Sequence, residues 1–469
     1  MKALRIVLMT HGTRGDVQPL VALGREFVRR GHEPVLAVPT GSADMVRAAG
    51  LPLEPLPVDW REFLASPSPD RSWVTSSDSE EFLAGLRTVM AAHAADIART
   101  LYQVSEGADL IVSGSLTEDM ATVIAEARNI PLALLQLFPV RPNHVVPNPF
   151  VTSKSSRIPG ANLKTHDAYE HASWEARRDG INRLRGAFGL ASTDLSTPQR
   201  ARMLGALEIQ GYSSHLVPGI EWPAHRPFAG WLELEGEDRA LAAEHGLDAD
   251  LESWLDAGDA PAYFGFGSTP VADPAAVMAM IERATGDLGL RAVVTAGWAG
   301  LPADAVSDPS RIRVVDSADL SALLPRCRFA VHHGGSGTTG AVIRAGVPAL
   351  VASGMLDQPM WGELVQRQGV GVHLPLHRLD TDGLRSAMWR LHDPGMVQAA
   401  RELGEAVRAE GNAVVRATEL ALAFARTSAL PPAADVTAER TAVVSRRSRG
   451  VTAPQGRRGG AGKHRGVAA

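Results

Sequence analysis

The sequence predicts an α/β protein built from two doubly wound, parallel-sheet domains. Its 469 residues are too many for one hydrophobic core, so two domains are expected. Short apolar segments alternate with stretches of helical periodicity in both halves, a pattern typical of parallel sheets covered by helices. Residues 216–236 contain three prolines and three glycines, and are predicted to link the two domains.

The first domain is predicted over residues 1–215. Its strands are expected at the apolar segments 4–10, 34–39, 110–115 and 131–139. Residues 17–30 have apolar residues at helical spacing and precede Gly31, a typical helix stop. Residues 140–175 are rich in Pro, Asn and Ser and show no clear period, which predicts a long loop, followed by a charged helix over 173–190.

The second domain is predicted over residues 237–405. Its strands are expected at residues 261–268, 291–297, 312–316, 329–333 and 348–353. The last segment, 428–469, differs from the rest because no acidic residue follows Glu439 while Arg and Lys recur. This composition predicts a disordered basic tail, with a contact to nucleic acid or an anionic membrane as the alternative.

The bulk composition is that of an ordinary globular protein, with 45% hydrophobic and 21% charged residues. The net charge of −5 provides no basic field for a nucleic-acid partner. The one cysteine, Cys327, excludes an internal disulfide framework and a multi-cysteine metal site. We expect neither a signal peptide nor a membrane-spanning helix, and therefore a cytoplasmic location without integral membrane association. The sequence gives no indication of oligomeric state.

The sharpest motif follows the predicted strand at 329–333, where His332 and His333 precede the glycine-rich turn GGSGTT and a helix. Backbone N–H groups at a helix N-terminus have no partner within the helix, and the helix dipole adds partial positive charge, so the turn is a candidate anion site. Glycines let the backbone approach a ligand, and hydroxyls and the imidazole add donors. The alternative interpretation is a tight turn with a capping hydroxyl.

Two further segments fall at the same predicted sheet edge. FGFGST ends the first strand of the second domain and contributes Ser268 and Thr269. Asp357 and Gln358 follow its last predicted strand. Open parallel sheets bind ligands at the carboxyl ends of their strands, and a carboxylate beside a carboxamide suits several hydroxyls. The alternative for Asp357 is a helix cap with Pro359 in the first turn, and the two interpretations are compatible.

The stretch THGTRGDVQP, residues 10–19, places Asp16 where a strand has ended and a helix is about to begin. Asp is a preferred helix N-cap, so a purely structural role is one interpretation. A carboxylate at this edge could instead accept a proton from a reacting hydroxyl. His11, five residues earlier, is the rival base, although a lone histidine beside a loop is also typical of structural positions.

Together these motifs resemble the inverting, nucleotide-sugar-dependent glycosyltransferases, a UDP-glycosyltransferase-like family with the GT-B fold, in which two Rossmann-like domains face a cleft. The similarity is strongest to the branch that includes sterol, antibiotic and glycolipid glycosyltransferases. It rests on GTRGDVQP (12–19), on FGFGST (264–269) and on the segment from HHGGSGTT to DQPMWGELVQRQGVG (332–371). It covers residues 1–425 and leaves out the tail.

The resemblance implies a role for each motif. The first domain would bind the acceptor, the second would bind the donor, and a last helix over 406–427 would cross back. His333 would contact the diphosphate, and Ser268 would approach it from the other loop. The GGSGTT turn would cradle the diphosphate through Gly335, Ser336, Gly337 and Thr338. Asp357 and Gln358 would hold the sugar hydroxyls.

Asp16 stands where many relatives carry a histidine general base, and an Asp is found there in the sterol-like and glycopeptide-antibiotic-like branches. In plant-like relatives a second Asp orients the histidine, and its place falls near Gly114, so that dyad is missing here. Relatives often stack an aromatic ring on the nucleobase from the loop that here spans 314–325, which has no aromatic residue. Trp298, one strand earlier, is either a substitute platform or a packing residue.

The sequence therefore predicts an inverting glycosyltransferase (a hexosyltransferase) that moves a sugar from a UDP- or dTDP-linked donor to a hydroxyl of a hydrophobic small molecule. No metal site and no cofactor beyond the nucleotide sugar are expected. Segments 60–85 and 140–175 are candidate walls for the acceptor. The alternatives are a nucleotide-sugar epimerase or hydrolase on the same fold, and a non-catalytic auxiliary subunit that resembles a transferase.

Overall fold

The computed structural model describes residues 2–65, 79–236, 238–239, 247–271 and 273–428. These residues pack as one compact unit. The predicted basic tail lies outside the described residues, apart from Ser428, and so does part of the predicted acceptor wall at 60–85. The predicted domain boundaries stay predictions.

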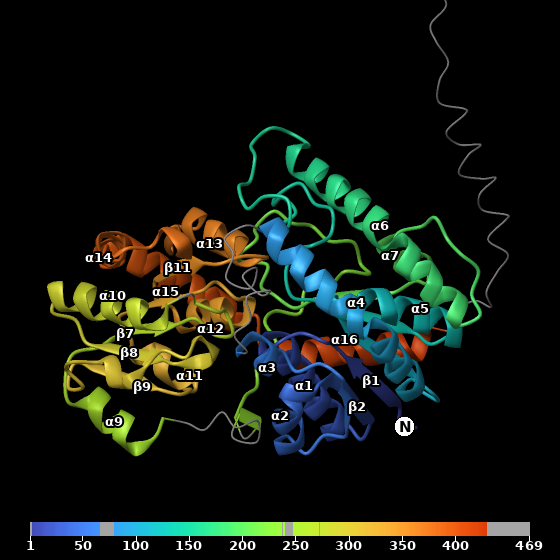
Figure 1. The fold of residues 1–469 in the computed structure, drawn as a ribbon, viewed down its shortest axis with the longest axis horizontal. Coiled ribbons are helices and arrows are strands. Elements are labelled where there is room, and N and C mark those ends of the chain that lie inside the picture. The colour runs from blue at the N-terminus through green and yellow to red at the C-terminus, as the bar shows by residue number, and fades with distance from the viewer. Residues whose placement is uncertain (1, 66–78, 237, 240–246, 272, 429–469) are drawn as a thin grey trace, which may run out of the picture. The chain divides into compact units, whose positions relative to one another are not determined.

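The described residues form two six-stranded parallel sheets covered by helices (Figure 1). The strands of the first sheet are β1 (Arg5–Met9), β2 (Glu33–Pro39), β3 (Leu53–Leu56), β4 (Leu110–Gly114), β5 (Leu132–Gln136) and β6 (Leu207–Gln210). Those of the second are β7 (Ala262–Gly265), β8 (Ala292–Thr295), β9 (Ile312–Val315), β10 (Phe329–His332), β11 (Ala349–Ser353) and β12 (Gly371–Pro375). The predicted fold class, two doubly wound α/β sheets, is confirmed.

Both sheets have the same strand order. The first runs β3-β2-β1-β4-β5-β6 and the second runs β9-β8-β7-β10-β11-β12. In each sheet the order reverses between the first strand and the fourth, that is, between β1 and β4 and between β7 and β10. Such a switch point leaves a crevice outside the carboxyl ends of the two central strands, where ligands bind in open parallel sheets.

Helices connect the strands and cover both sheets. The α-helices are α1 (Arg14–Arg29), α2 (Ala43–Ala48), α3 (Trp60–Ala65), α4 (Ser79–Val104), α5 (Glu118–Arg128), α6 (Ala161–Ala187), α7 (Thr197–Met203), α9 (Ala249–Asp256), α10 (Pro274–Asp287), α11 (Leu320–Leu323), α12 (Ser336–Ala345), α13 (Gln358–Arg367), α14 (Thr381–Arg390), α15 (Pro394–Ala409) and α16 (Ala413–Thr427). Short 3-10 helices are η1 (Thr40–Ser42), η3 (Ser115–Thr117), η4 (Gly297–Ala299), η5 (Ala303–Ala305), η6 (Leu324–Arg326) and η7 (Leu376–Arg378).

All nine strands predicted from the sequence are confirmed, and three that were not predicted lie at sheet edges. These are β3, β6 and β12. Edge strands need no continuous apolar run, because only one side pairs with a neighbour, and they tolerate proline. Accordingly β3 reads LEPL, β6 reads LEIQ and β12 reads GVHLP, none of which resembles the apolar strands at the centre.

Two helix boundaries predicted from the sequence were wrong. The helix expected over 173–190 begins much earlier, at Ala161, directly after Gly160 in the left-handed region at φ 76°. Three of its five buried residues, Asn162, His166 and Arg185, are polar, so the helix shows little apolar periodicity. The helix expected over 17–30 begins at Arg14. Residues 140–160 are irregular, as predicted.

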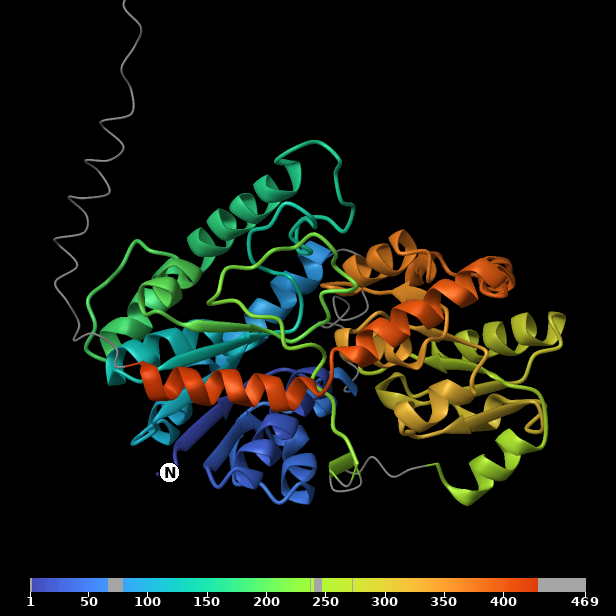
Figure 2. The ribbon, with the colours of Figure 1, turned by 180° about the vertical axis from the view of Figure 1, so that it is seen from behind.

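The last helix, α16, lies against the first sheet rather than the second (Figure 2). It packs on α1 and on β6, and its buried face joins the same hydrophobic cluster as the apolar face of α1. Val414, Ala417 and Ala421 supply that face. The resemblance implied a crossing helix at this point of the chain. Because α1 carries Asp16 in its first turn, α16 supports the helix from which Asp16 projects.

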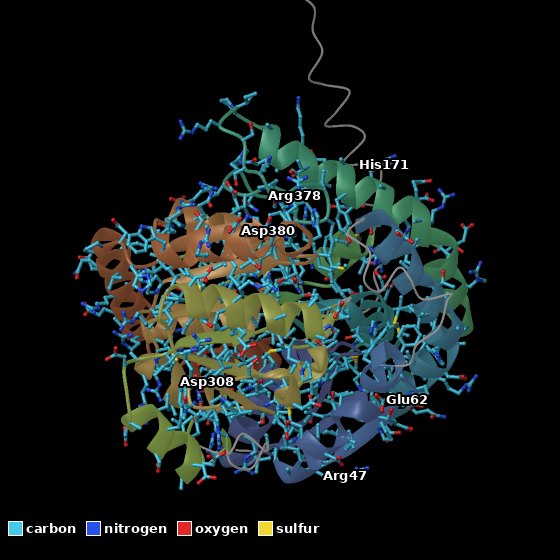
Figure 3. The ribbon with its side chains drawn as sticks, turned by 60° about the vertical axis from the view of Figure 1, so that its left-hand side comes forward. Arg47, Glu62, His171, Asp308, Arg378 and Asp380 are labelled. Carbon is cyan, nitrogen blue, oxygen red and sulfur yellow. The ribbon has the colours of Figure 1, made fainter. Side chains whose placement is uncertain are left out.

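Charged side chains lie mostly on the outside, as Arg47, Asp308 and Asp380 do (Figure 3). A buried exception fixes the loop after β5. Arg141 donates to Glu118 at the start of α5 and to Glu208 on β6, each at 2.5 Å. All three side chains are at least nine-tenths buried as residues.

Replacing Arg141 with Met should lower the free energy of unfolding by about 3–5 kcal/mol, because Glu118 loses its charged partner in a buried setting and Glu208 loses one of two. Urea unfolding followed by circular dichroism measures this change. The matched control is Arg385→Met, since Arg385 pairs with Asp287 and Asp382 at the surface and should cost less than about 1 kcal/mol. Equal losses of unfolding free energy in the two variants would contradict the role of Arg141 as a buried partner of Glu118 and Glu208.

Candidate active site

Most of the predicted site residues lie at the two switch points. The loop after β1 carries His11 and leads into α1, whose first turn carries Asp16, and it lies beside the loop after β4. In the second sheet, the loop after β7 carries Ser268, and the loop after β10 carries the GGSGTT turn. Each position is therefore the carboxyl end of a central strand, the place where parallel sheets bind ligands.

Asp16 is the third residue of α1, so it does not occupy the N-cap position, which belongs to Thr13. Its Oδ2 accepts the backbone N–H of Thr13 at 2.9 Å, which satisfies one of the free donors at the helix start. Gly12 leaves the room for this, because a Cβ there would lie 2.0 Å from Oδ2. The structural and catalytic interpretations are thus compatible, since one oxygen caps and the other remains.

Burial raises the pKa of Asp16 from 3.8 to about 7. The Thr13 N–H lowers it and the negative charge of Asp357, from the second sheet, raises it further. A carboxyl group with a pKa near the working pH is better matched to proton transfer than an ordinary aspartate.

His11, the rival base, is buried, with 6% of its surface exposed. Its backbone carbonyl accepts the indole N–H of Trp60, and burial lowers the pKa of its imidazole to about 4. Nδ1 has no hydrogen-bond partner among the described residues. The position expected for an orienting Asp is tight, because a Cβ on Gly114 would lie 3.0 Å from the Thr10 hydroxyl, which would have to shift by a few tenths of an ångström.

Asp119 and Arg177 form a pair near His11. Asp119 lies in the first turn of α5, where acidic residues are favoured. Its negative charge raises the pKa of the His11 imidazole, against the larger, opposite effect of burial. It accepts from Arg177 on α6 at 2.6 Å and from the Thr197 hydroxyl. Both of its oxygens are therefore occupied by protein donors. Asp119 and Arg177 therefore lie at the edge of the first sheet, and neither was among the site residues predicted from the sequence.

His333 is held between the two glycine-rich loops. A Cβ on Gly267 would lie 2.7 Å from its ring, and one on Gly335 would lie 2.4 Å from Nε2, so glycine is required on both sides. Burial lowers the pKa of His333 to about 4, which leaves the imidazole uncharged at neutral pH. Any contact with a diphosphate would then be a neutral hydrogen bond, and the positive potential would come from the helix N-terminus.

The GGSGTT turn leads directly into α12, whose N-cap is Gly335. No side chain caps this helix, so its first N–H groups stay available. Gly337 is exposed and Thr338 is partly exposed at this end. The Ser336 hydroxyl, in contrast, donates to the carbonyl oxygen of Leu137, after β5, at 2.8 Å. The hydroxyl could donate to a phosphate only if this bond broke. The backbone N–H of Ser336 takes no part in this bond.

The loop after β7 touches both the first sheet and the loop after β11. The Ser268 hydroxyl donates to the Thr13 hydroxyl at 3.3 Å. Thr13 is the N-cap of α1 and precedes Asp16 by three residues. The Gln358 carboxamide donates to the Thr269 hydroxyl at 3.1 Å and accepts the N–H of Gly354 at 2.8 Å. Gln358 therefore ties these two loops together, and only part of its hydrogen-bonding capacity is left for a ligand.

Asp357 occupies the N-cap position of α13, but its side chain does not cap the helix. Oδ2 instead accepts the indole N–H of Trp361 at 2.9 Å. Burial raises the pKa of Asp357 to about 6, and the hydrogen bond from Trp361 lowers it. Oδ1 has no such indole donor. The sequence predicted Asp357 and did not single out Trp361, although the spacing of four residues along a helix was a usable signal.

Trp298 lies in η4 and is half-buried. Its ring packs against the hydrophobic cluster of the first sheet that contains Val58 and Trp60, so it contacts the other half of the molecule. Its backbone N–H donates to the carbonyl oxygen of Gly267 at 3.1 Å. This placement corresponds to the packing interpretation. A role as a platform for the nucleobase stays a prediction.

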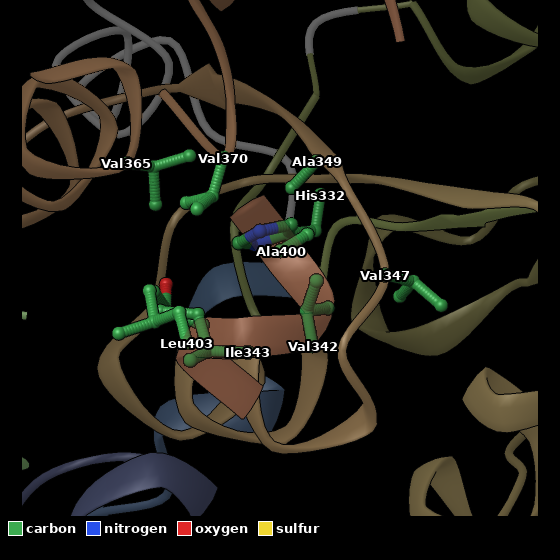
Figure 4. Close-up of a pocket in the computed structure, with 10 residues that line it drawn as sticks. His332, Val342, Ile343, Val347, Ala349, Val365, Val370, Ala400 and Leu403 are labelled. Carbon is green, nitrogen blue, oxygen red and sulfur yellow. The ribbon is translucent and has the colours of Figure 1, made fainter. Parts of the chain in front are cut away.

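His332, the first of the two histidines, lies behind the turn. Its Nδ1 accepts the N–H of Gly334 at 3.1 Å, which fixes the start of the turn. The ring lines a small apolar cavity with Val342, Ile343 and Leu403 (Figure 4). Its Nε2 has no hydrogen-bond partner among the described residues, and burial lowers its pKa to about 3. His332 is thus a neutral support for the turn.

Within the described ranges, no three His, Cys, Asp or Glu side chains are grouped so that they could hold a metal ion. The predicted absence of a metal stays a prediction. In the same ranges, every helix is too short or too polar to span a membrane.

Two family models match the chain. Residues 6–147 match the glycosyltransferase family 28 N-terminal domain, and residues 280–423 match the C-terminal domain of proteins similar to erythromycin biosynthesis protein CIII. Asp16 lies in the first match, and His333 and Asp357 lie in the second.

Curated relatives are similar over nearly their full length. An uncharacterized glycosyltransferase of Mycobacterium tuberculosis is 32% identical over 89% of this chain and 98% of its own. The O-mycaminosyltylonolide 6-deoxyallosyltransferase of Streptomyces fradiae is 31% identical over 87% of this chain and 94% of its own. Among solved structures, the glycosyltransferase VinC in complex with dTDP aligns with a TM-score of 0.62 and 20% identity, over 91% of this chain and all of its own.

An Asp16→Asn variant tests the raised pKa of Asp16. The folded state retains a proton on Asp16 up to about pH 7, whereas the unfolded chain loses it near pH 4, so the stability from that proton is lost as pH rises between these values. Relative to Asp16→Asn, the wild type should therefore lose about 2–3 kcal/mol of unfolding free energy between pH 5 and pH 8. Urea unfolding at several pH values measures the difference.

The control for this experiment is Asp44→Asn, because Asp44 is fully exposed on α2. That substitution removes an exposed carboxyl group and should change the unfolding free energy by less than about 0.5 kcal/mol. A difference between Asp16→Asn and the wild type that does not change between pH 5 and pH 8 would mean that Asp16 has an ordinary pKa.

Proposed function

This chain is a glycosyltransferase with the GT-B fold, and on that basis we propose that it is an inverting enzyme in which Asp16 is the general base. The observation that carries the proposal is the position of Asp16. Its carboxyl group, with a pKa near 7, lies at the switch point of the first sheet beside Thr13, which the donor-side Ser268 touches at 3.3 Å. A hydroxyl bound there would meet a base on one side and a donor on the other.

The proposed reaction is a direct displacement at the anomeric carbon. The acceptor oxygen attacks from the face opposite the nucleoside diphosphate, its proton passes to Asp16, and the bond to the diphosphate oxygen breaks. General-base catalysis of this kind contributes about 10²–10⁴-fold. The free N–H groups of α12 and its dipole would stabilise the charge that develops on the leaving diphosphate.

The proposed donor is a UDP- or dTDP-hexose. Support for the diphosphate site comes from the uncapped N-terminus of α12 and the imidazole of His333, held between two glycines. Oδ1 of Asp357 and the remaining capacity of Gln358 would bind the sugar hydroxyls. The structural relative VinC carries dTDP in its crystal structure, which is consistent with a pyrimidine nucleotide. The nucleotide sugar is itself the co-substrate, and we propose no metal or other cofactor.

The proposed acceptor is a hydrophobic small molecule, such as a natural-product aglycone, a sterol or a glycolipid. The tylonolide-type substrate in the name of the Streptomyces relative and the similarity to an erythromycin biosynthesis protein favour an antibiotic aglycone. Leu116 is 44% exposed, and its backbone contacts His11. Its side chain therefore offers apolar surface at the first-sheet edge. The reaction is assigned to the cytoplasm, in keeping with the single cysteine.

The pH dependence of turnover tests Asp16 against His11. If Asp16 is the base, kcat/KM should fall tenfold per pH unit below about pH 7, because protonation removes the acceptor of the proton. Asp16→Asn should lower kcat by about 10²–10⁴-fold and remove this limb. The measurement is an initial-rate profile from pH 5 to 9 with an acceptor found by screening aglycones.

His11→Gln serves as the comparison variant in this profile. Burial keeps the pKa of His11 near 4, so a His11 base would place the acidic limb there and not near pH 7. A profile that is flat between pH 5.5 and 8 in the wild type, together with inactivity of His11→Gln, would assign the base to His11.

Thermal unfolding with nucleotides tests the donor site. UDP or dTDP at 100 times its dissociation constant should stabilise the wild type by about 2.7 kcal/mol, whereas ADP, GDP and NAD should not. His333→Ala should reduce the shift, and His377→Ala, an exposed histidine in η7, should leave it unchanged. A shift with NAD alone would overturn the transferase site and return the GGSGTT turn to a structural role.

A further inference from the structure

We propose that two buried tryptophans, Trp231 and Trp361, are positioning residues for the nucleotide-sugar donor, Trp361 acting through Asp357 and Trp231 acting through the first turn of α12. This inference rests on the proposed function, because it assigns supports to residues that the proposed function places on the donor. Neither tryptophan reaches the solvent, with 3% and 0% of their surfaces exposed, so neither can touch the donor from the open side of the site.

Trp361 controls the direction of the Asp357 carboxylate. It lies one turn along α13, and its Nε1 donates to Asp357 Oδ2 at 2.9 Å. An aspartate at an N-cap position ordinarily turns back to accept N–H groups of its own helix, and here it does not. The indole therefore takes one carboxylate oxygen and leaves the other for a ligand. The Asp357 backbone is helical (φ −78°, ψ −14°) and a proline lies in the first turn, so loss of that bond would leave the side chain free to rotate without a cap to hold it.

This bond also favours the charged form of the carboxylate. Burial raises the pKa of Asp357 to about 6, and the Trp361 N–H opposes that rise. A charged carboxylate is the stronger acceptor for sugar hydroxyls. Loss of the indole N–H would therefore weaken sugar binding in two ways, by releasing the side chain and by favouring its neutral form.

Trp231 acts on α12, which bears the proposed diphosphate site. Its Nε1 donates to the Ser336 hydroxyl at 3.3 Å, and that hydroxyl in turn donates to the Leu137 carbonyl. Its ring covers Gly340, one turn further along, where a Cβ would lie 2.6 Å from the indole. Trp231 thus contacts α12 at two successive turns, which fixes the axis along which its first N–H groups point.

The two indoles contact each other behind the site. Their rings lie 6.1 Å apart and are tilted by 53°. Both belong to the same hydrophobic cluster, which also contains Tyr212, 6.0 Å from Trp361. Trp231 comes from the segment between the two sheets, and Trp361 comes from α13. The pair therefore joins the sugar side and the phosphate side of the proposed donor site through a packed, apolar contact.

Binding of two kinds of probe separates the two roles. Isothermal titration would use UDP and dTDP, and the UDP- or dTDP-hexose that the wild type binds most tightly. Trp361→Phe keeps the ring and removes the N–H, so it should weaken hexose-nucleotide binding about 10-fold and leave the nucleoside diphosphate within twofold. Trp231→Phe should weaken both probes by about fivefold, because it acts on α12.

A double-mutant cycle tests whether Trp361 works through Asp357. Asp357→Asn should weaken the hexose nucleotide at least as much as Trp361→Phe, and the double variant should bind no more weakly than Asp357→Asn alone. Trp389→Phe is the matched control, since Trp389 on α14 is 71% exposed and should change neither affinity. Thermal unfolding of each variant checks folding, and Trp361→Tyr is the second variant if Trp361→Phe is unstable.

The outcomes distinguish this inference from the proposed function. If Asp357→Asn weakens the hexose nucleotide and Trp361→Phe does not, the positioning role is wrong and the donor site stands. Additive losses in the double variant would overturn it in the same way. If Asp357→Asn binds the hexose nucleotide as the wild type does, the proposed sugar contact is wrong and Trp361 has no role through it.

Discussion

A parallel sheet places the carboxyl ends of its strands, and the N-termini of the helices that follow them, on a single edge. That constraint determines where chemistry can occur in this chain. In the first sheet the edge receives the short loop that leads into α1, with Asp16 in its first turn, and in the second it receives the turn that opens α12. One edge supplies a carboxylate and the other supplies free N–H groups, so the proposed base and the proposed anion site arise from the same topology.

Burial shapes the electrostatics of these edges more than ion pairing does. It raises the pKa values of Asp16 and Asp357 to about 7 and about 6, and it lowers those of His332 and His333 to about 3 and about 4. Near neutral pH both histidines are therefore uncharged. The positive potential that a diphosphate needs must come from the N-terminus of α12, while Asp16 is poised to gain or lose a proton.

Contacts between the two sheet edges include polar ones, besides the apolar packing of Trp298 on the first-sheet cluster. Ser268 touches Thr13, Ser336 touches Leu137, and Arg367 donates to Ser155 at 2.7 Å. The first two involve residues of the predicted donor site, so that site is partly held by the half of the molecule that contains the first sheet. Side chains assigned to a ligand by motif alone can have a second, structural partner, as the Ser336 hydroxyl does.

The sequence by itself determined the fold class, nine of the twelve strands and the chemical type of most predicted site residues. Local signals were sufficient for these, because apolar runs, glycine-rich turns and the DQ pair are contiguous in the chain. Only the tertiary structure decided which atoms meet: that Trp361 orients Asp357, that Trp231 supports α12, and that Trp298 packs on the first sheet. The edge strands β3, β6 and β12 and the start of α6 also escaped prediction, because burial against distant residues, and not local periodicity, stabilises them.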